Sequence, residues 1–346
     1  MAEVTIYGAG IFGLSIAFTC LKRGAKVRVI DPAGPGAGAS GGIVGALAPH
    51  VPENWNSKKA FQFESLLKAS GFWDKVEAVS GKSSGYERTG RLQPVLDEKA
   101  ECLAKERAKN AADLWQGEAV WEVCKSDDFE FTPKTPTGLL IHDTLSARLH
   151  PAKACDALAT AILRLGGEIL TAGKGQGAIL HATGVHDLQK ISHAFGQNTG
   201  NGVKGQAALI DFSAQNSPQL FADTLHIIPH ADGTTAVGST SERDFSDANS
   251  TSRLLDDLLV RAREAVPALV DAPVIARWAG VRPRAKSRAP MLGHHPLHKG
   301  EFIANGGFKI GFGVAPMVAE VMADLILDGK DTIPEDFHPS ASLPEV

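Results

Sequence analysis

Three glycines and an acid near the start of the chain have the spacing of a dinucleotide-binding turn. Gly8, Gly10 and Gly13 form a G-x-G-x-x-G motif between an apolar run and a helical pattern, and Asp31 ends the next apolar run. The glycines allow a tight turn and a close backbone approach to a pyrophosphate, which lies on the helix N-terminus. The acid accepts hydrogen bonds from a ribose hydroxyl and argues against a ribose 2′-phosphate. The pattern predicts a nucleotide site, and a βαβ crossover without a nucleotide is the alternative.

Two cations further along the chain could bind an acidic substrate. Arg282 lies in the small-residue segment Trp278–Pro283, and Lys309 lies in the glycine-rich segment Gly306–Gly313. A guanidinium matches a carboxylate with two parallel hydrogen bonds, and an ammonium adds a point charge. The alternatives are a surface salt bridge for Arg282 and a solvated side chain for Lys309.

The composition is that of a globular protein and does not favour nucleic acid or a membrane. The chain has 346 residues and a net charge of −4, and no apolar run is long enough to span a bilayer. Its four cysteines have neither a C-x-x-C pair nor a zinc spacing, which is typical of a reducing compartment, and Cys20 and Cys155 are expected to be buried thiols. With no signal peptide expected, we predict a cytoplasmic protein and leave its oligomeric state open.

Histidines cluster in one short segment, at His294, His295 and His298. Their spacing fits no common metal site. We therefore expect surface histidines in a proline-containing loop and predict no metal centre. His50 could face a substrate pocket and is left unassigned.

The apolar periodicity predicts alternating helices and strands around these motifs. Helices are expected from Leu14 to about Leu21 and over 59–79, 98–115, 154–165, 250–266 and 315–327. Strands are expected over 4–7, 27–30, 90–96, 137–142, 168–170, 178–182, 207–212, 225–228, 235–237, 275–281 and 302–304. The last thirteen residues, 334–346, contain three prolines and are expected to form a loose tail.

Together with the first turn, four later segments resemble the D-amino acid oxidase-like FAD-dependent oxidoreductases, and they occur in that family's order. They are Gly38-Ala39-Ser40-Gly41-Gly42, Ala182-Thr183-Gly184, Trp278–Pro283 followed by Ala289–Gly293, and Gly306–Pro316. Three smaller segments, 45–49, 203–206 and 238–245, are similar to the oxidase half of the bifunctional tRNA wobble-uridine modification enzyme, which belongs to the same group. The resemblance extends in patches from Val4 to Leu327.

The resemblance implies noncovalently bound FAD, because no Cys or His matches a covalent attachment position. It also implies that Arg282 and Lys309 bind the substrate carboxylate and that the last glycine-rich loop leads into a helix aimed at the flavin. The implied cofactor-binding residues are Gly8, Gly10, Ile11, Phe12, Gly13, Asp31, Ala39, Ser40, Gly41, Gly42, Thr183, Gly184, Gly307, Phe308, Lys309, Ile310 and Gly311.

The implied fold is α/β, α+β overall, with a Rossmann-like FAD-binding domain and an interleaved antiparallel-sheet substrate domain. The expected FAD-binding segments are 1–50, 137–202 and 275–346, and the expected substrate-domain segments are 51–136 and 203–274.

The chain departs from the family pattern in two places. About a dozen residues separate the strand at 168–170 from Thr183, so the β-meander that normally helps to wall the adenine pocket is expected to be deleted. Weaker FAD binding or a wall from another segment would follow. Ala236 stands where sarcosine oxidase has a lysine implicated in oxygen activation, so the electron acceptor, O₂ or another, is left open.

The predicted function is oxidation of a small carboxylate-bearing amine to the imine by hydride transfer to the flavin. Two alternatives remain open. One is an oxidase that acts on carboxymethylaminomethyl-uridine in tRNA, although nucleic acid is not favoured by the charge. The other is a flavin-binding subunit of a hetero-oligomeric amine dehydrogenase. An NAD-dependent dehydrogenase fits the first turn but not the later motifs.

Overall fold

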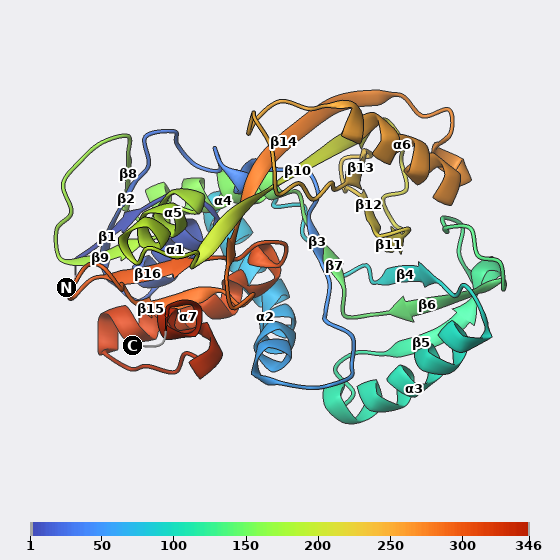
Figure 1. Cartoon of the computed structure of the whole chain (residues 1–346), viewed down its shortest axis with the longest axis horizontal. Coiled ribbons are helices and arrows are strands. Elements are labelled where there is room, and N and C mark those ends of the chain that lie inside the picture. The colour runs from blue at the N-terminus through green and yellow to red at the C-terminus, as the bar shows by residue number, and fades with distance from the viewer. Residues whose placement is uncertain (1–2, 345–346) are drawn as a thin grey trace.

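The first two strands and the last two strands of the chain lie in one six-stranded sheet in the computed structural model, which describes residues 3–344 (Figure 1). Its order is β15-β16-β9-β1-β2-β8, and all neighbours are parallel except β15 and β16. The strands are β1 (Glu3–Tyr7), β2 (Lys26–Ile30), β8 (Glu168–Leu170), β9 (Ala178–His181), β15 (Met291–His294) and β16 (Phe302–Asn305). Such parallel sheets bind ligands at the carboxyl ends of their strands, and the G-x-G-x-x-G turn follows β1.

Apolar helices pack together beside this sheet and form the larger core. They are α1 (Ile11–Lys22), α2 (Ser57–Ser80), α4 (Pro151–Arg164) and α7 (Gly311–Asp328). α1 and α7 contribute fully buried side chains such as Leu14, Ile16, Val318 and Met322. A fifth helix, α5 (Val185–Ala194), packs against the long strands β10 and β14 instead.

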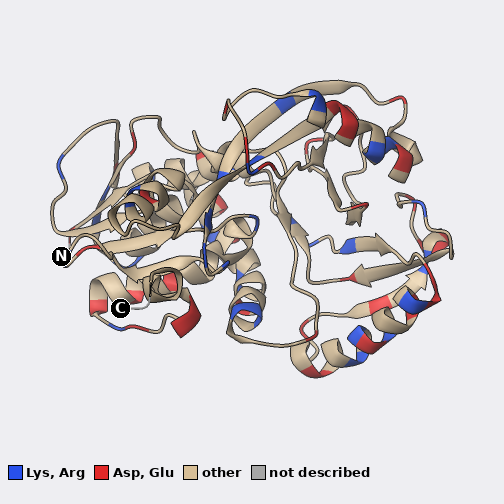
Figure 2. Cartoon of the chain, viewed as in Figure 1, with Lys and Arg blue, Asp and Glu red and all other residues tan. Residues whose placement is uncertain are grey.

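The second sheet has eight strands in the order β14-β10-β13-β12-β11-β4-β6-β5, with one parallel pair, β4 and β11. The strands are β4 (Arg91–Pro94), β5 (Trp121–Lys125), β6 (Leu139–Asp143), β10 (Gly200–Ile210), β11 (Gln219–Ala222), β12 (Leu225–Pro229), β13 (Thr235–Gly238) and β14 (Val274–Ala285). α3 (Glu98–Trp115) packs on β5, and α6 (Arg253–Ala265) packs on β10 and β13. Lys and Arg alternate with Asp and Glu along α3, as expected for a solvated face (Figure 2). A small sheet pairs β3 (Ala46–Leu47) with β7 (Ala147–Arg148).

The fold class predicted from the sequence is confirmed, with local differences. α7 begins at Gly311, four residues earlier than expected, and α5 was not expected at all. The expectation of a loose C-terminal tail is wrong for the described residues. Glu335–Phe337 and Pro339–Ser342 form 3₁₀ turns, and the buried Phe337 ring lies 4.7 Å from the ring of Phe61.

The expected domain limits differ from sheet membership in two segments. β6 begins at Leu139 and β14 spans Val274–Ala285, and both pair within the eight-stranded sheet rather than the six-stranded one. The local pattern of these strands does not specify their neighbours, which are distant in sequence. The division into two domains remains a prediction.

The β-meander is absent between β8 and β9, as the sequence predicts. The connection Thr171–Gly177 contains no strand and folds back onto β1. The Thr5 hydroxyl donates to Gln176 O at 2.8 Å and accepts from Gln176 N at 2.9 Å. The seven-residue connection therefore packs against β1.

Cys20 and Cys155 are free and buried, as expected. No helix among residues 3–344 is both long enough and apolar enough to cross a bilayer.

Candidate cofactor and active site

Three helix N-termini meet at one cavity of about 940 Å³. α1, α5 and α7 begin at Ile11, Val185 and Gly311, which all line the cavity. No N-cap residue caps its own helix with a side chain, although Ser40 Oγ accepts from the first N–H of α1. Uncapped N-termini present free N–H groups and the positive end of the helix dipole. The cavity is therefore built to bind an anionic ligand.

The first glycine turn brings three backbones into direct contact. A Cβ on Gly8, which has φ +105°, would lie 2.3 Å from the carbonyl oxygen of Ala182. A Cβ on Gly13 would lie 2.0 Å from the carbonyl oxygen of Gly8. These glycines set the close packing of β1, α1 and β9 around the turn 8–13, which we call the glycine cradle.

Asp31 lies at the end of β2 and holds this turn in place. Its Oδ2 accepts from Ala9 N at 2.8 Å, and its Oδ1 accepts from Ala33 N at 3.0 Å. A carboxylate accepts up to about four hydrogen bonds, so it retains capacity for a ribose hydroxyl. Asp31 lines the cavity, as the sequence predicts.

The G-A-S-G loop lies across the N-terminus of α1. Ser40 Oγ accepts from Ile11 N at 3.0 Å, and the Ser40 hydroxyl hydrogen remains free to donate to a ligand. Ala39, Ser40 and Gly42 line the cavity. Gly41 does not, and a Cβ there would meet the carbonyl oxygen of Gly36 at 2.2 Å. Gly41, like Gly13, therefore serves packing rather than the ligand surface.

The segment after β9 offers a polar atom without a partner. Thr183 Oγ1 is buried and forms no hydrogen bond with the described residues, and both Thr183 and Gly184 line the cavity. A buried hydroxyl without a partner is costly unless a ligand or water satisfies it. Together with the glycine cradle and the helix N-termini, it fits the phosphate-rich part of a dinucleotide.

The last glycine-rich loop closes the cavity beside α1. Gly307, Phe308, Lys309 and Gly311 line it, whereas Ile310 does not. A Cβ on Gly307 would lie 2.7 Å from Phe12 Cζ, so this glycine lets the loop contact the Phe12 ring.

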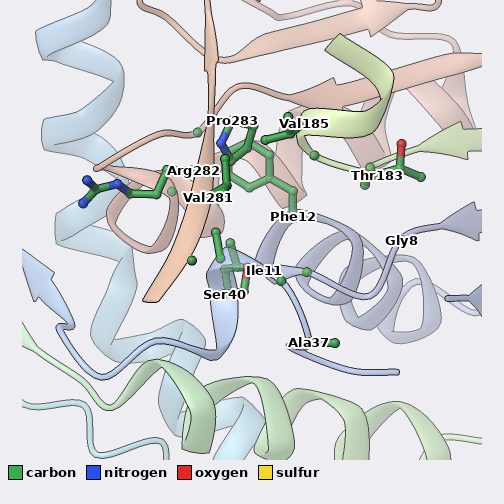
Figure 3. A pocket seen from close by; sticks show the side chains of 18 of the residues that line it. Gly8, Ile11, Phe12, Ala37, Ser40, Thr183, Val185, Val281, Arg282 and Pro283 are labelled. Atoms are coloured by element: carbon green, nitrogen blue, oxygen red, sulfur yellow. Dashed lines mark hydrogen bonds between the residues drawn. The ribbon is translucent and has the colours of Figure 1, made fainter. Parts of the chain in front are cut away.

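Arg282 extends from β14 at the opposite end of the cavity from Thr183 (Figure 3). Its Nη1 donates to Ser239 Oγ at 2.6 Å, and its Nη2 donates to Thr240 O at 2.7 Å. Its Nε is buried without a partner among the described residues. Burial lowers the pKa of Arg282 to about 10, with the charge of Glu242 opposing the shift. Arg282 remains cationic at neutral pH, with donors left for a ligand.

Lys309 is exposed toward the open cavity. The pKa of its ammonium is nevertheless lowered, first by the partial desolvation that the surrounding chain causes and then by the charges of Arg282 and Arg284.

His226 of β12 lines the same cavity. The sequence reasoning missed it, because a lone histidine in an apolar strand carries no signal. Burial lowers the pKa of His226 to about 3, with smaller effects from Arg91, Lys309 and Arg282. His226 is therefore neutral.

The histidine cluster differs from its expectation, since His295 is buried and only 6% exposed. His298 is exposed, and both rings contact His181 at the end of β9. Leu297 N donates to His295 Nδ1 at 3.0 Å, so a neutral His295 carries its proton on Nε2, which lies 3.8 Å from Asp187 Oδ2. One ring nitrogen each of His181, His295 and His298 nevertheless lies within 4.8 Å of the others, which is close enough for the three to bind one metal ion. The spacing in sequence missed this grouping because His181 is distant along the chain, and the absence of a metal centre remains a prediction.

His50 does not line the cavity and instead hydrogen-bonds the Gln62 side chain.

Elsewhere on the cavity wall, Thr171, Ala172 and Gly173 follow β8 and lie with the first turns of α5.

Residues 3–325 match the family described as FAD dependent oxidoreductase. The chain belongs to this family. As a member it is an oxidoreductase that uses FAD, and the cradle described above fits that cofactor.

Individual relatives are distant but cover the whole chain. Glycine oxidase of Pseudomonas putida is 25% identical and aligns over 99% of both chains. Glycine oxidase of Geobacillus kaustophilus is 23% identical over 95% of this chain and 94% of the relative. The structure named iminodiacetate oxidase from Chelativorans sp. BNC1 superimposes with a TM-score of 0.82 at 21% identity, covering 97% of this chain and 98% of that one. At this identity the structural likeness establishes the fold alone.

Proposed function

We propose that the chain oxidises a small amine that carries a carboxylate, with bound FAD as the hydride acceptor. One observation carries this proposal: Arg282 and Lys309 line the same cavity as the dinucleotide cradle. The names of the relatives, glycine oxidase and iminodiacetate oxidase, support the same class of substrate.

In this proposal the two cations orient the substrate. The Arg282 guanidinium and the Lys309 ammonium bind the carboxylate and fix the direction of the neighbouring C–H bond. When bound, FAD supplies an isoalloxazine ring that accepts the hydride from that carbon. Positioning of this kind lowers the barrier without further covalent chemistry by the protein.

The amine must be neutral, because its lone pair forms the C=N bond as the hydride leaves. Water then hydrolyses the iminium to a carbonyl compound and an ammonium ion. Asp31 and Asp187 are the acids that line the cavity among residues 3–344, and Asp31 already accepts two backbone N–H groups. We therefore assign no side-chain base and expect the rate of flavin reduction to rise with pH as the free amine deprotonates.

A tRNA substrate is less well supported by the charges at the cavity. Its lining carries Lys190, Arg282 and Lys309 against Asp31 and Asp187, which is a nearly balanced set rather than a basic rim.

The proposal is tested by anaerobic mixing of the FAD-loaded protein with glycine-like, D- and N-substituted amino acids. Flavin bleaching should occur and should slow with substrates deuterated at the α-carbon. Bleaching with no isotope effect on the reduction step would contradict hydride transfer from that carbon as the slow step. Subsequent admission of O₂ distinguishes an oxidase from a dehydrogenase that needs another acceptor.

A further inference from the structure

Three cations surround the ring of Phe308, which lines the cavity together with Arg282 and Lys309, whereas Arg284 lies beside that ring and outside the cavity lining. The guanidinium carbons of Arg282 and Arg284 lie 5.6 and 5.2 Å from the centre of the Phe308 ring, and Lys309 Nζ lies 5.8 Å from it. Arg282 and Arg284 are two residues apart on β14, so their side chains share one face of the strand. The backbone of Arg284 also pairs with Gly307, which ties this strand to the loop that carries Phe308 and Lys309.

The chain does not balance this positive charge. None of the three cations forms a salt bridge with a carboxylate of residues 3–344, and neither Arg284 nor Lys309 has a side-chain hydrogen bond there. Glu242 is the acid whose charge reaches Arg282, but its carboxylate is bonded to Gln206 and Thr240. Like charges gathered at a partly desolvated site repel one another unless an anion joins them.

A neighbouring arginine on the same strand behaves differently. Arg277, also on β14, is exposed and donates to Asp256 at 2.7 Å. Arg284 is less exposed than Arg277, yet it has no acid partner among the described residues. The missing countercharge is therefore a property of the end of β14 that contacts the Phe308 loop rather than of the whole strand.

One substrate carboxylate, bound by Arg282 and Lys309 as proposed above, leaves Arg284 unpaired. We propose that the substrate amine carries a second carboxylate and that Arg284 binds it. This inference rests on the proposed function and narrows its substrate class to amines with two carboxylates. Arg284 is then the residue that separates such amines from those with one carboxylate.

The test uses the FAD-loaded protein and two ethers that cannot be oxidised as amines. Oxydiacetate has two carboxylates, and methoxyacetate has one but is otherwise similar. Their dissociation constants are measured from the change in flavin absorption on binding. We expect oxydiacetate to bind about tenfold or more tightly, because a charge-assisted hydrogen bond to a guanidinium is among the strong ones.

The variants identify the residue responsible for the preference. Arg284→Gln should remove most of the preference for oxydiacetate and change methoxyacetate binding much less than oxydiacetate binding. Arg284→Lys should retain part of the preference, because it keeps the charge. Arg277→Gln is the matched control on the same strand and should change neither dissociation constant.

Two results would overturn the inference: equal binding of both ethers by the unaltered protein, or an equal loss of both in Arg284→Gln. The flavin bleaching experiment distinguishes a failure of the second-carboxylate inference from a failure of the proposed function. Bleaching by amines with one carboxylate but no preference for oxydiacetate rejects the second carboxylate alone. A preference for oxydiacetate without bleaching by any carboxylate-bearing amine rejects the proposed oxidation and leaves a site for two carboxylates.

Discussion

Ser40 Oγ accepts a hydrogen bond of 3.0 Å from the backbone N–H of Ile11, which joins the G-A-S-G loop to the first residue of α1. This contact connects two motifs that lie twenty-nine positions apart. It places the free hydrogen of the Ser40 hydroxyl beside the helix N-terminus, where the phosphates of a dinucleotide are expected.

Loss of this contact should weaken FAD binding. Ser40→Ala removes the acceptor for Ile11 N and should raise the FAD dissociation constant roughly five- to tenfold, as expected for about 1 kcal/mol from one hydrogen bond. Fluorescence titration of the apoprotein with FAD measures the change. Ser70→Ala, at an exposed position of α2, is the control, and an unchanged affinity in Ser40→Ala would remove the loop from the cofactor site.

A substitution in the glycine cradle should weaken FAD binding more than Ser40→Ala does. Gly13→Ala puts a Cβ 2.0 Å from the carbonyl oxygen of Gly8, so β1 and α1 must separate. We expect the free energy of unfolding of the apoprotein to fall by about 1–3 kcal/mol, as for overpacking, and FAD binding to be lost. Urea unfolding and flavin content measure the two effects.

Gly71→Ala is the matched control, since a Cβ there meets nothing within 4 Å in the interior of α2. It should stabilise the protein by up to about 1 kcal/mol through helix propensity. If Gly13→Ala were as well tolerated as Gly71→Ala, the close packing described here would be incorrect.

These sites show what the sequence could and could not predict. Gly8 and Asp31 could be found because the chemistry of a dinucleotide fixes both residue type and local spacing, whereas Ser40 was found through the resemblance of its loop to the family's G-A-S-G motif. His226 and Arg284 could not be found, because strand pairing in the eight-stranded sheet brings His226 to the cavity and Arg284 to the ring of Phe308. Strand neighbours such as β4 and β11 are distant in sequence, and short apolar runs do not encode their pairing.

Element limits were hardest to predict where short-range signals conflict. α5 has many polar residues and follows Gly184, so its sequence resembles a loop, although Leu188 and Ile191 are buried. The three prolines near the C-terminus predict a loose tail, yet Phe337 anchors that segment against Phe61. Here tertiary packing outweighs local propensity.

The charge state of Lys309 predicts how carboxylate binding depends on pH. Only the ammonium form attracts a carboxylate, and the pKa of Lys309 is lowered by burial and by Arg282 and Arg284. Binding of methoxyacetate should therefore weaken as pH rises, beginning below the usual lysine pKa. Lys309→Met should bind it about tenfold more weakly at neutral pH, since one charge-assisted contact is lost, and should flatten this dependence.

Lys299→Met, in an exposed turn, is the control for Lys309→Met. Flavin content should be unchanged in both variants. If methoxyacetate binding still depended on pH in Lys309→Met, a group other than Lys309 would be responsible for that dependence.

Two buried histidines predict a loss of stability in mild acid. The pKa of His226 is lowered to about 3 and that of His230 to about 4, in both cases chiefly by burial. The unfolded chain therefore binds more protons than the folded one once pH falls below about 6.5, and stability decreases from there downwards. Each histidine contributes a slope of about 1 kcal/mol per pH unit between roughly pH 6 and pH 5.

Urea unfolding of the FAD-loaded protein at pH 7, 6 and 5 measures this slope. His226→Gln should reduce it by about 1 kcal/mol per pH unit. His193→Gln, at an exposed position of α5, should leave it unchanged. An identical slope in His226→Gln would mean that His226 titrates normally in the folded protein.

The central claim is that FAD bound in this cavity oxidises an amine held by its carboxylate. The most direct measurement is anaerobic flavin bleaching by pairs of amines that differ only in the carboxylate, such as N-methylglycine against dimethylamine and iminodiacetate against N-methylglycine. Acid should release the flavin as free FAD, and bleaching should require at least one carboxylate and be fastest with two. Equal bleaching by dimethylamine, or no bleaching by any carboxylate-bearing amine, would contradict the account.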